Sequence, residues 1–179
     1  MIQNYNNYRI LKIFLDDPLH GFGLREISRI LKLGLPSVSN YIKQLEKEQL
    51  IIKKDIYGKK LWFGNRDSIQ FKTYKKFDTI RVINESKIIK YLDEKLNIPT
   101  IILYGSHTRG EDRKESDIDL FIITPSKNRI EIEKFEKIIG KKLHIITNNE
   151  SEFEKLNKEM KNNLVNGIVL SGYFKLLKE

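Results

Sequence analysis

Residues 99–123 read PTIILYGSHTRGEDRKESDIDLFII, and this stretch decides the fold of the second half of the chain. The β-branched apolar run at 100–104 predicts a buried strand, and Gly105-Ser106 directly after it predicts the start of a short helix. A second apolar run begins at Asp117-Ile118-Asp119 and predicts another strand. A small α/β domain with a mixed sheet is therefore expected in this part of the chain.

Two features of this stretch indicate its chemistry. A strand that leads into Gly-Ser at a helix start is typical of a phosphate site, because glycine lets the backbone approach the ligand while N–H groups and the serine hydroxyl face it. Arg109, one turn further on, can add positive charge. Asp117 and Asp119 lie two residues apart on a strand, so both carboxylates face the same way. Such a pair beside phosphates predicts a Mg²⁺ site, because Mg²⁺ prefers carboxylate and phosphate oxygen.

The strand, Gly105-Ser106, ten intervening residues and Asp117-x-Asp119 together resemble the GSx10DxD signature of minimal nucleotidyltransferases of the DNA polymerase β superfamily. The resemblance implies that Gly105, Ser106 and Arg109 bind a nucleoside triphosphate, with ATP the first expectation, and that Asp117 and Asp119 hold Mg²⁺ or Mn²⁺. It also implies transfer of a nucleoside monophosphate to an acceptor hydroxyl with release of pyrophosphate. Enzymes with this signature include antitoxins that AMPylate HEPN-type RNase toxins, so a protein acceptor such as a toxin is expected.

The third carboxylate of that family is expected on the predicted strand KKLHIIT at 141–147, where His144 stands in the matching position. Imidazole is a poor ligand for Mg²⁺ but accepts Mn²⁺ and can act as a base near neutral pH, so we expect His144 as the third catalytic residue. Alternatively, His144 is a packed strand residue, and the domain senses nucleotide without turnover in a transcription regulator. Glu111 and Glu115 are further candidates for the missing acid, and His107 is expected to be exposed on the short helix.

Residues 1–66 predict three helices followed by a β-hairpin. The first helix ends at Asp16-Asp17-Pro18, Pro36 suits the first turn of the third, and the segment LIIKKDIYGKKLWFGN at 50–65 alternates around Tyr57-Gly58 as a hairpin does. The helices are expected to bury Ile10, Leu11, Ile13 and Phe14, then Leu24, Ile27, Ile30 and Leu31, then Val38, Ile42 and Leu45.

The sequence GLREISRILKLGLPSVSNYIKQLEKEQLI at 23–51 resembles the winged helix-turn-helix of small prokaryotic transcription regulators. The resemblance implies binding of double-stranded DNA, with the third helix in the major groove and the hairpin on phosphates. The distribution of charge along the chain also favours DNA binding by the first part. Residues 1–66 hold 12 Lys and Arg against 6 acids, whereas residues 97–179 hold 14 against 13. A protein-docking role is the alternative. The expected DNA-binding residues are Ser39, Asn40, Lys43, Lys47, Lys53, Lys54, Lys59 and Lys60.

Residues 67–97 predict a continuous helical connector, since they hold apolar residues at helical spacing and neither Gly nor Pro. This connector is expected to be a fixed spacer or to form the interface of a homodimer. The expected fold is thus α/β (α+β), with a winged helix-turn-helix at 1–66, the connector at 67–97 and a polymerase-β-like nucleotidyltransferase domain at 98–179. A cytoplasmic location without a membrane partner is expected, because the chain has no cysteine and no long apolar run.

Overall fold

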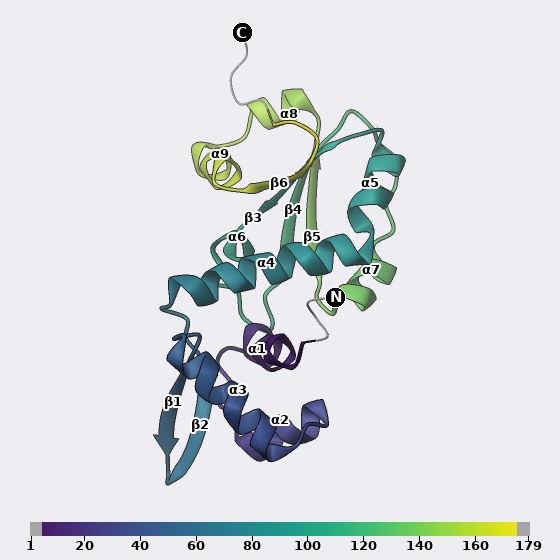
Figure 1. The fold of residues 1–179 in the computed structure, drawn as a ribbon. Coiled ribbons are helices and arrows are strands. Elements are labelled where there is room, and N and C mark those ends of the chain that lie inside the picture. The colour runs from purple at the N-terminus through teal and green to yellow at the C-terminus, as the bar shows by residue number, and fades with distance from the viewer. Residues whose placement is uncertain (1–4, 175–179) are drawn as a thin grey trace. The chain divides into compact units, whose positions relative to one another are not determined.

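The computed structural model describes residues 5–174, and these fall into two compact units, one ending at Lys75 and the other beginning at Lys76. Both units are drawn in Figure 1. The outermost residues of the predicted first and last segments, 1–4 and 175–179, lie outside the described part. Within residues 5–174, no helix is both long and apolar enough to cross a membrane.

The first unit consists of three helices and an antiparallel hairpin, which lie where the sequence predicts them (Figure 1). Pro36 stands in the first turn of the third helix, where the missing N–H costs no hydrogen bond. Tyr57 and Gly58 turn the hairpin, and both have a positive φ. The elements are α1 (Asn6–Asp16), α2 (Leu24–Leu31), α3 (Leu35–Lys47), β1 (Ile51–Ile56) and β2 (Lys59–Gly64).

One apolar core holds the first unit together, and it includes buried residues from all three helices and from the hairpin. Ile30 does not belong to it. We expected Ile30 on the buried face of α2, but 53% of it is exposed. The buried face of α2 is centred on Ile27, and Ile30 lies at its edge. The fully buried members on the helices include Ile10, Phe14, Ile27, Val38, Ile42 and Leu45.

The second unit is built around a four-stranded mixed sheet with the order β5-β4-β3-β6, which agrees with the expected mixed sheet. Strand β4 pairs parallel with β5, while β3 pairs antiparallel with both β4 and β6. The elements are α4 (Ile69–Ser86), which begins in the first unit, α5 (Ile88–Leu96), β3 (Thr100–Tyr104), α6 (Ser106–Arg109), β4 (Ile118–Ile123), α7 (Glu133–Ile139), β5 (Leu143–Asn148), α8 (Glu150–Glu154), α9 (Lys158–Val165) and β6 (Ile168–Ser171).

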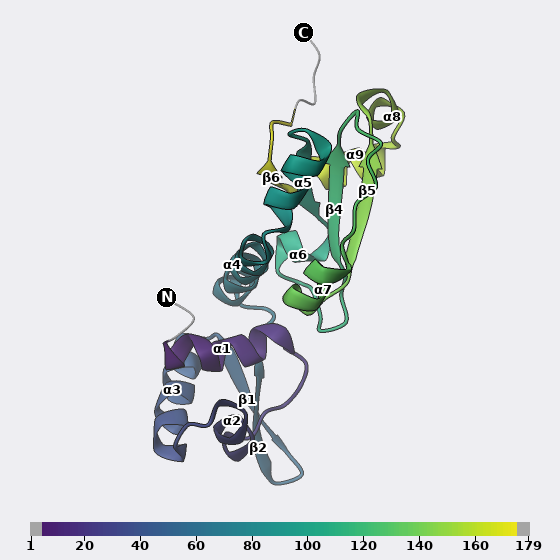
Figure 2. The same cartoon turned by 90° about the vertical axis from the view of Figure 1, so that its right-hand side faces the viewer.

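Helices cover both faces of this sheet (Figure 2). On one face, residues of α4, α5 and α7 pack against alternate side chains of β3 and β4, including Leu103 and Leu120. On the other face, residues of α8 and α9 pack against Ile102 and Phe121. The two central strands are therefore held from both sides, and the residues at their ends have fixed positions.

The predicted connector is not one continuous helix, because Lys87 adopts the left-handed conformation between α4 and α5. Ser86 explains the break. Its hydroxyl donates to the carbonyl of Ile83 at 2.6 Å and accepts from the N–H of Ile88 at 3.2 Å, so a side chain replaces the helical hydrogen bonds there. The chain turns after Ser86, which lets α5 pack on the sheet as a separate helix.

Candidate functional site

Gly105 stands where β3 ends and α6 begins, in a conformation (φ +78°, ψ −152°) that is largely restricted to glycine. A Cβ at this position would lie 2.5 Å from Oδ2 of Asp119. The absence of a side chain therefore lets the Asp119 carboxylate lie directly against the backbone at the start of α6. The predicted Gly-Ser turn and one of the two predicted acids are adjacent in the structure.

Helix α6 is a single turn whose hydrogen bonds keep Arg109 close to this glycine. Nη1 of Arg109 donates to the carbonyl oxygen of Gly105 at 3.2 Å, and its Nε donates to Oε2 of Glu111 at 3.0 Å. The hydroxyl of Thr108 donates to the same Gly105 oxygen at 2.7 Å. Ser106, the first residue of α6, is half-buried, whereas Arg109 is exposed. A positive charge thus lies within one turn of the glycine.

Asp119 lies between two other strands of the sheet. It pairs in register with Tyr104 of β3 on one side and with His144 of β5 on the other. Oδ1 of Asp119 is 3.1 Å from Nδ1 of His144, so these side chains form a hydrogen-bonded pair. The His144 side chain is 57% exposed, which argues against a role in the packed core. Asp117 is exposed immediately before β4.

Burial and the nearby carboxylate of Asp119, in that order, raise the pKa of Tyr104 above its usual value. The phenol next to the candidate site is therefore neutral near pH 7. Asp119 thus faces an uncharged neighbour on β3 and an imidazole on β5.

The donor set fits a hard divalent cation that also binds phosphate. Asp117 and Asp119 offer carboxylate oxygens, and Gly105 leaves open the space beside Asp119 that a side chain would fill. Within residues 5–174, no group of three or more His, Asp or Glu residues has the arrangement of a complete metal site. Two carboxylates would fill only part of the octahedral shell of Mg²⁺, which usually takes its other ligands from phosphate and water oxygens.

His107 is buried, contrary to the expectation of an exposed residue, and only 1% of it is accessible. Its Nδ1 is 3.0 Å from the hydroxyl of Thr79 in α4 and 3.6 Å from Oδ1 of Asp112. His107 lies two positions before the exposed Arg109, so the single turn of α6 directs them to opposite sides. The contact with Thr79 links α6 to α4. The sequence held one sign of this burial, because a residue two positions from an exposed arginine on a helix points to the other side.

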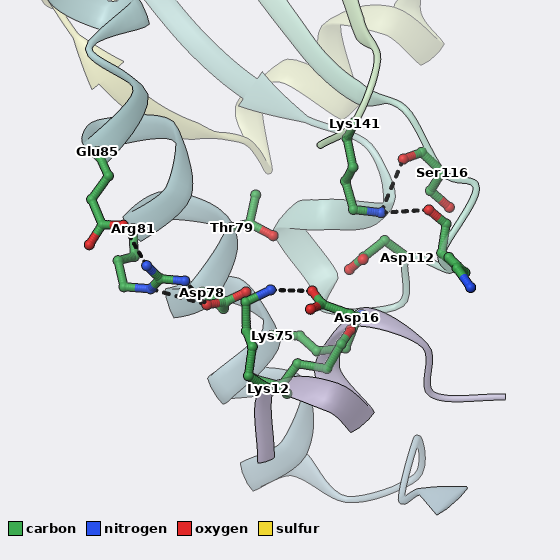
Figure 3. Close-up of polar contacts among 12 residues, drawn as sticks. Lys12, Asp16, Lys75, Asp78, Thr79, Arg81, Glu85, Asp112, Ser116 and Lys141 are labelled. Atoms are coloured by element: carbon green, nitrogen blue, oxygen red, sulfur yellow. Dashed lines mark hydrogen bonds and ion pairs between the residues drawn. The ribbon is translucent and has the colours of Figure 1, made fainter. Parts of the chain in front are cut away.

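Lys141 is a second residue whose contacts the sequence analysis did not predict. Its ammonium points at the loop before Asp117, and the contact with Ser116 is drawn in Figure 3. The same close-up shows Arg81 of α4 between the buried Asp78 and the exposed Glu85, with which it forms ion pairs. A lysine three residues before His144 carries no recognisable motif, so only the structure reveals its contacts.

The residues expected to bind DNA lie on α3 and the hairpin of the first unit. Ser39 is half-buried, whereas Asn40, Lys43 and Lys47 are exposed on α3. All four hairpin lysines, Lys53, Lys54, Lys59 and Lys60, are exposed as well. The ammonium of Lys53 lies 5.7 Å from the Trp62 ring centre, and that of Lys54 lies 5.2 Å from the Phe63 ring centre.

Comparison with known proteins assigns the second unit to a class. Residues 86–174 match the family described as "Polymerase beta, Nucleotidyltransferase". The second unit therefore carries a nucleotidyltransferase-like domain of the polymerase β type. A Methanocaldococcus jannaschii protein named as a proposed protein adenylyltransferase is 38% identical over 65 residues, which cover 32% of this chain. The match spans 65% of that relative's length.

Among solved structures, a crystal structure of a proposed nucleotidyltransferase from Sulfolobus solfataricus is also similar. The similarity covers 55% of this chain and 84% of that one, with 13% sequence identity and a TM-score of 0.34.

Proposed function

We propose that the chain is a metal-dependent nucleotidyltransferase that transfers a nucleoside monophosphate from a nucleoside triphosphate, ATP in the first instance, to a macromolecular acceptor. The observation that carries the proposal is the position of Asp119, directly against Gly105 on one side and hydrogen-bonded to His144 on the other. Strand pairing brings this acid to the turn that would bind phosphate. The family match of residues 86–174 supports the same reaction class.

In this proposal Asp117 and Asp119 hold Mg²⁺ or Mn²⁺, which neutralises phosphate charge when bound. The backbone at Gly105 and Ser106 and the side chain of Arg109 bind the triphosphate. The oxygen of the acceptor hydroxyl forms a bond to the α-phosphorus, the bond from that phosphorus to the β-phosphate oxygen breaks, and pyrophosphate leaves. His144 accepts the hydroxyl proton at Nε2, because its Nδ1 faces Asp119.

A protein is the proposed acceptor. The relative from M. jannaschii is named for adenylyl transfer to protein, and its similarity to this chain supports the same acceptor class here. A toxin, as in antitoxin systems that carry the same signature, is the first acceptor to try.

The absence of cysteine fits an enzyme that acts in the cytoplasm.

We further propose that the first unit is a winged helix-turn-helix that binds double-stranded DNA. Three helices followed by a hairpin, with exposed lysines on α3 and on both strands of the hairpin, support this proposal. Lys43 and Lys47 recur every four residues on α3 and would lie on one face of it. Lysines on a hairpin neutralise phosphates without reading base sequence.

Incorporation of label from α-labelled ATP tests the transfer. The purified chain is incubated with Mg²⁺ or Mn²⁺ and candidate acceptor proteins, and label that survives denaturation is measured. The proposal expects covalent label with the parent and none with Asp117→Ala. Gly58→Ala, which changes the hairpin turn of the first unit, is the matched control and should retain label. Equal labelling by the parent and Asp117→Ala would refute the assigned site.

A regulator that binds nucleotide without turnover is the second candidate function. The feature that favours it is His144, an imidazole where the family is expected to have a carboxylate. A sensor would show metal-dependent nucleotide binding that is lost in Asp119→Ala, together with no transferred label for any acceptor. Measurements of nucleotide binding and of label transfer therefore separate the sensor from the enzyme.

The DNA proposal is tested by the salt dependence of binding to a DNA fragment. Each lysine–phosphate contact that is removed should reduce the slope of log K against log salt concentration by about 1. Lys59→Ala/Lys60→Ala, on the hairpin, is therefore expected to reduce it by about 2. Lys43→Ala/Lys47→Ala, on α3, is expected to weaken binding at low salt. No binding by the parent at low salt, or no effect of either double substitution, would show that the first unit does not use this surface for DNA.

A further inference from the structure

The loop that delivers Asp117 to β4 is rich in charge and is folded into a tight turn. Within it, the N–H of Ser116 donates to the carbonyl oxygen of Arg113 at 3.1 Å. The N–H of Arg113 in turn donates to Oγ of Ser116 at 2.9 Å. Asp117 follows this turn directly, and its own side chain is exposed. Its position therefore depends on what holds the turn.

The ammonium of Lys141 holds the turn from outside the loop. Nζ of Lys141 donates to the carbonyl oxygen of Lys114 at 2.9 Å, to that of Arg113 at 3.0 Å and to that of Ser116 at 3.4 Å. Figure 3 shows the side chain of Lys141 reaching toward Ser116. Three carbonyl dipoles that converge on one point repel one another unless a cation lies there, and a lysine ammonium has three donors to match them.

The residue after Asp117 is held from the same segment, because the N–H of Ile118 donates to the carbonyl oxygen of Lys142 at 2.9 Å. Lys142 directs its own ammonium elsewhere, to Oε2 of Glu136 at 3.0 Å. The two neighbouring lysines therefore have different roles. Residues 141 and 142 fix the backbone on both sides of Asp117, one by a side chain and the other by its backbone.

We infer that Lys141 is a positioning residue for the metal–nucleotide site, which presents the carboxylate of Asp117 by ordering the loop at 113–116. The inference rests on the proposed function, since it assumes that Asp117 is a metal ligand. Lys141 touches neither metal nor substrate and acts through the loop. Outer partners that orient metal ligands affect metal affinity by about 10- to 100-fold. The role of Lys141 is therefore measurable as binding, independently of turnover.

The test measures Mn²⁺ binding to the full chain in the presence of ATP, by the electron paramagnetic resonance signal of free Mn²⁺. Lys141→Met keeps the length of the side chain and removes the charge. We expect it to weaken Mn²⁺ binding by about 10-fold or more. Lys141→Arg keeps the charge and several donors, and it should recover most of the affinity. Lys137→Met, which alters an exposed lysine of α7, is the matched control and should bind as the parent does.

The outcomes separate the inference from the proposal on which it rests. If the parent does not bind Mn²⁺, or if Asp117→Asn binds Mn²⁺ as well as the parent does, the proposed metal site is wrong. The inference about Lys141 is then wrong as well. If the parent binds and Lys141→Met binds equally well, only the inference is overturned. A purely structural role predicts lower thermal stability in Lys141→Met with unchanged affinity in the folded protein. Should that variant fail to fold, Lys141→Gln, which keeps a donor without charge, must still weaken Mn²⁺ binding.

Discussion

Replacing Gly105 by alanine separates the geometry of the candidate site from general stability. The added Cβ would lie 2.5 Å from Oδ2 of Asp119, a distance that real Cβ contacts do not reach, so the carboxylate must move. The backbone at Gly105 also has a positive φ of 78° with ψ near −152°, which costs about 1–3 kcal/mol for a residue other than glycine. We therefore expect Gly105→Ala to lose both stability and ligand binding.

Each kcal/mol of lost stability should lower the melting temperature of a unit of this size by roughly 4–8 °C. Far-UV circular dichroism follows the unfolding. Trp62 is the single tryptophan of the chain, so its fluorescence reports the first unit separately. The melting curve is then repeated with ATP and Mn²⁺, and Gly105→Ala should show little or none of the ligand-induced rise seen with the parent.

Gly58→Ala is the matched control. Gly58 lies in the hairpin turn of the first unit with a φ of 75°, close to that of Gly105, but no atom lies within 4 Å of the Cβ that would be added. The backbone penalty alone should cost about 1–2 kcal/mol and leave the ligand response intact. If Gly105→Ala keeps the full ligand response, as Gly58→Ala should, the contact between Gly105 and Asp119 has no part in binding, and the reasoning is refuted.

Three further substitutions give separate expectations. The N–H of Leu143 and, less strongly, the ammonium of Lys142 lower the pKa of Glu136 below its usual value. The contribution of Glu136 to stability is therefore present above the unfolded pKa and is lost as pH falls through the lower folded pKa. Urea unfolding should show Glu136→Gln less stable than the parent near pH 7 and equal to it in strong acid. His107→Leu should cost about 1–3 kcal/mol in the same assay, because the buried hydroxyl of Thr79 loses its partner, and an unchanged midpoint would contradict the anchoring role. His144→Asp should shift the metal preference of nucleotide binding from Mn²⁺ toward Mg²⁺, and an unaltered preference would show that residue 144 does not contact the metal.

Much of the fold follows from local sequence. The apolar run at 100–104, the Gly-Ser turn and the run that begins at Ile118 predict two strands and a short helix, and all three form. These elements are predictable because strand runs and glycine turns depend on residues close together in the chain. The hairpin around Tyr57-Gly58 is predictable for the same reason.

Two of the three errors in the fold concern features that depend on distant parts of the chain, and the third has a local cause. Periodicity places Ile30 near an apolar stripe, but the width of the buried face depends on which helices pack there. His107 becomes buried because α4 covers α6, and Thr79 lies 28 residues away in sequence. The break at Lys87 depends on hydrogen bonds of the Ser86 side chain, which competes with the helix.

In the candidate site, too, some features follow from local sequence and others depend on residues far apart in the chain. The sequence supplies Gly105, Asp117 and Asp119 by motif, and their binding roles stay predictions. Parallel pairing of β4 with β5 puts Asp119 opposite His144, a relation that spans 25 residues. The contacts of Lys141 span a similar distance, and no pattern in the sequence indicates them.

Thermal unfolding of the parent and of Asp117→Ala/Asp119→Ala, each with ATP and Mg²⁺ or Mn²⁺, tests whether these two carboxylates form a metal–nucleotide site. Ligand at about 100 times its dissociation constant should stabilise the parent by roughly 2.7 kcal/mol. We expect a metal-dependent rise in the melting temperature that the double substitution abolishes, with the ligand-free variant still folded. An equal rise in both proteins, or none with any nucleoside triphosphate and metal, would contradict the assignment of Asp117 and Asp119 to a metal–nucleotide site.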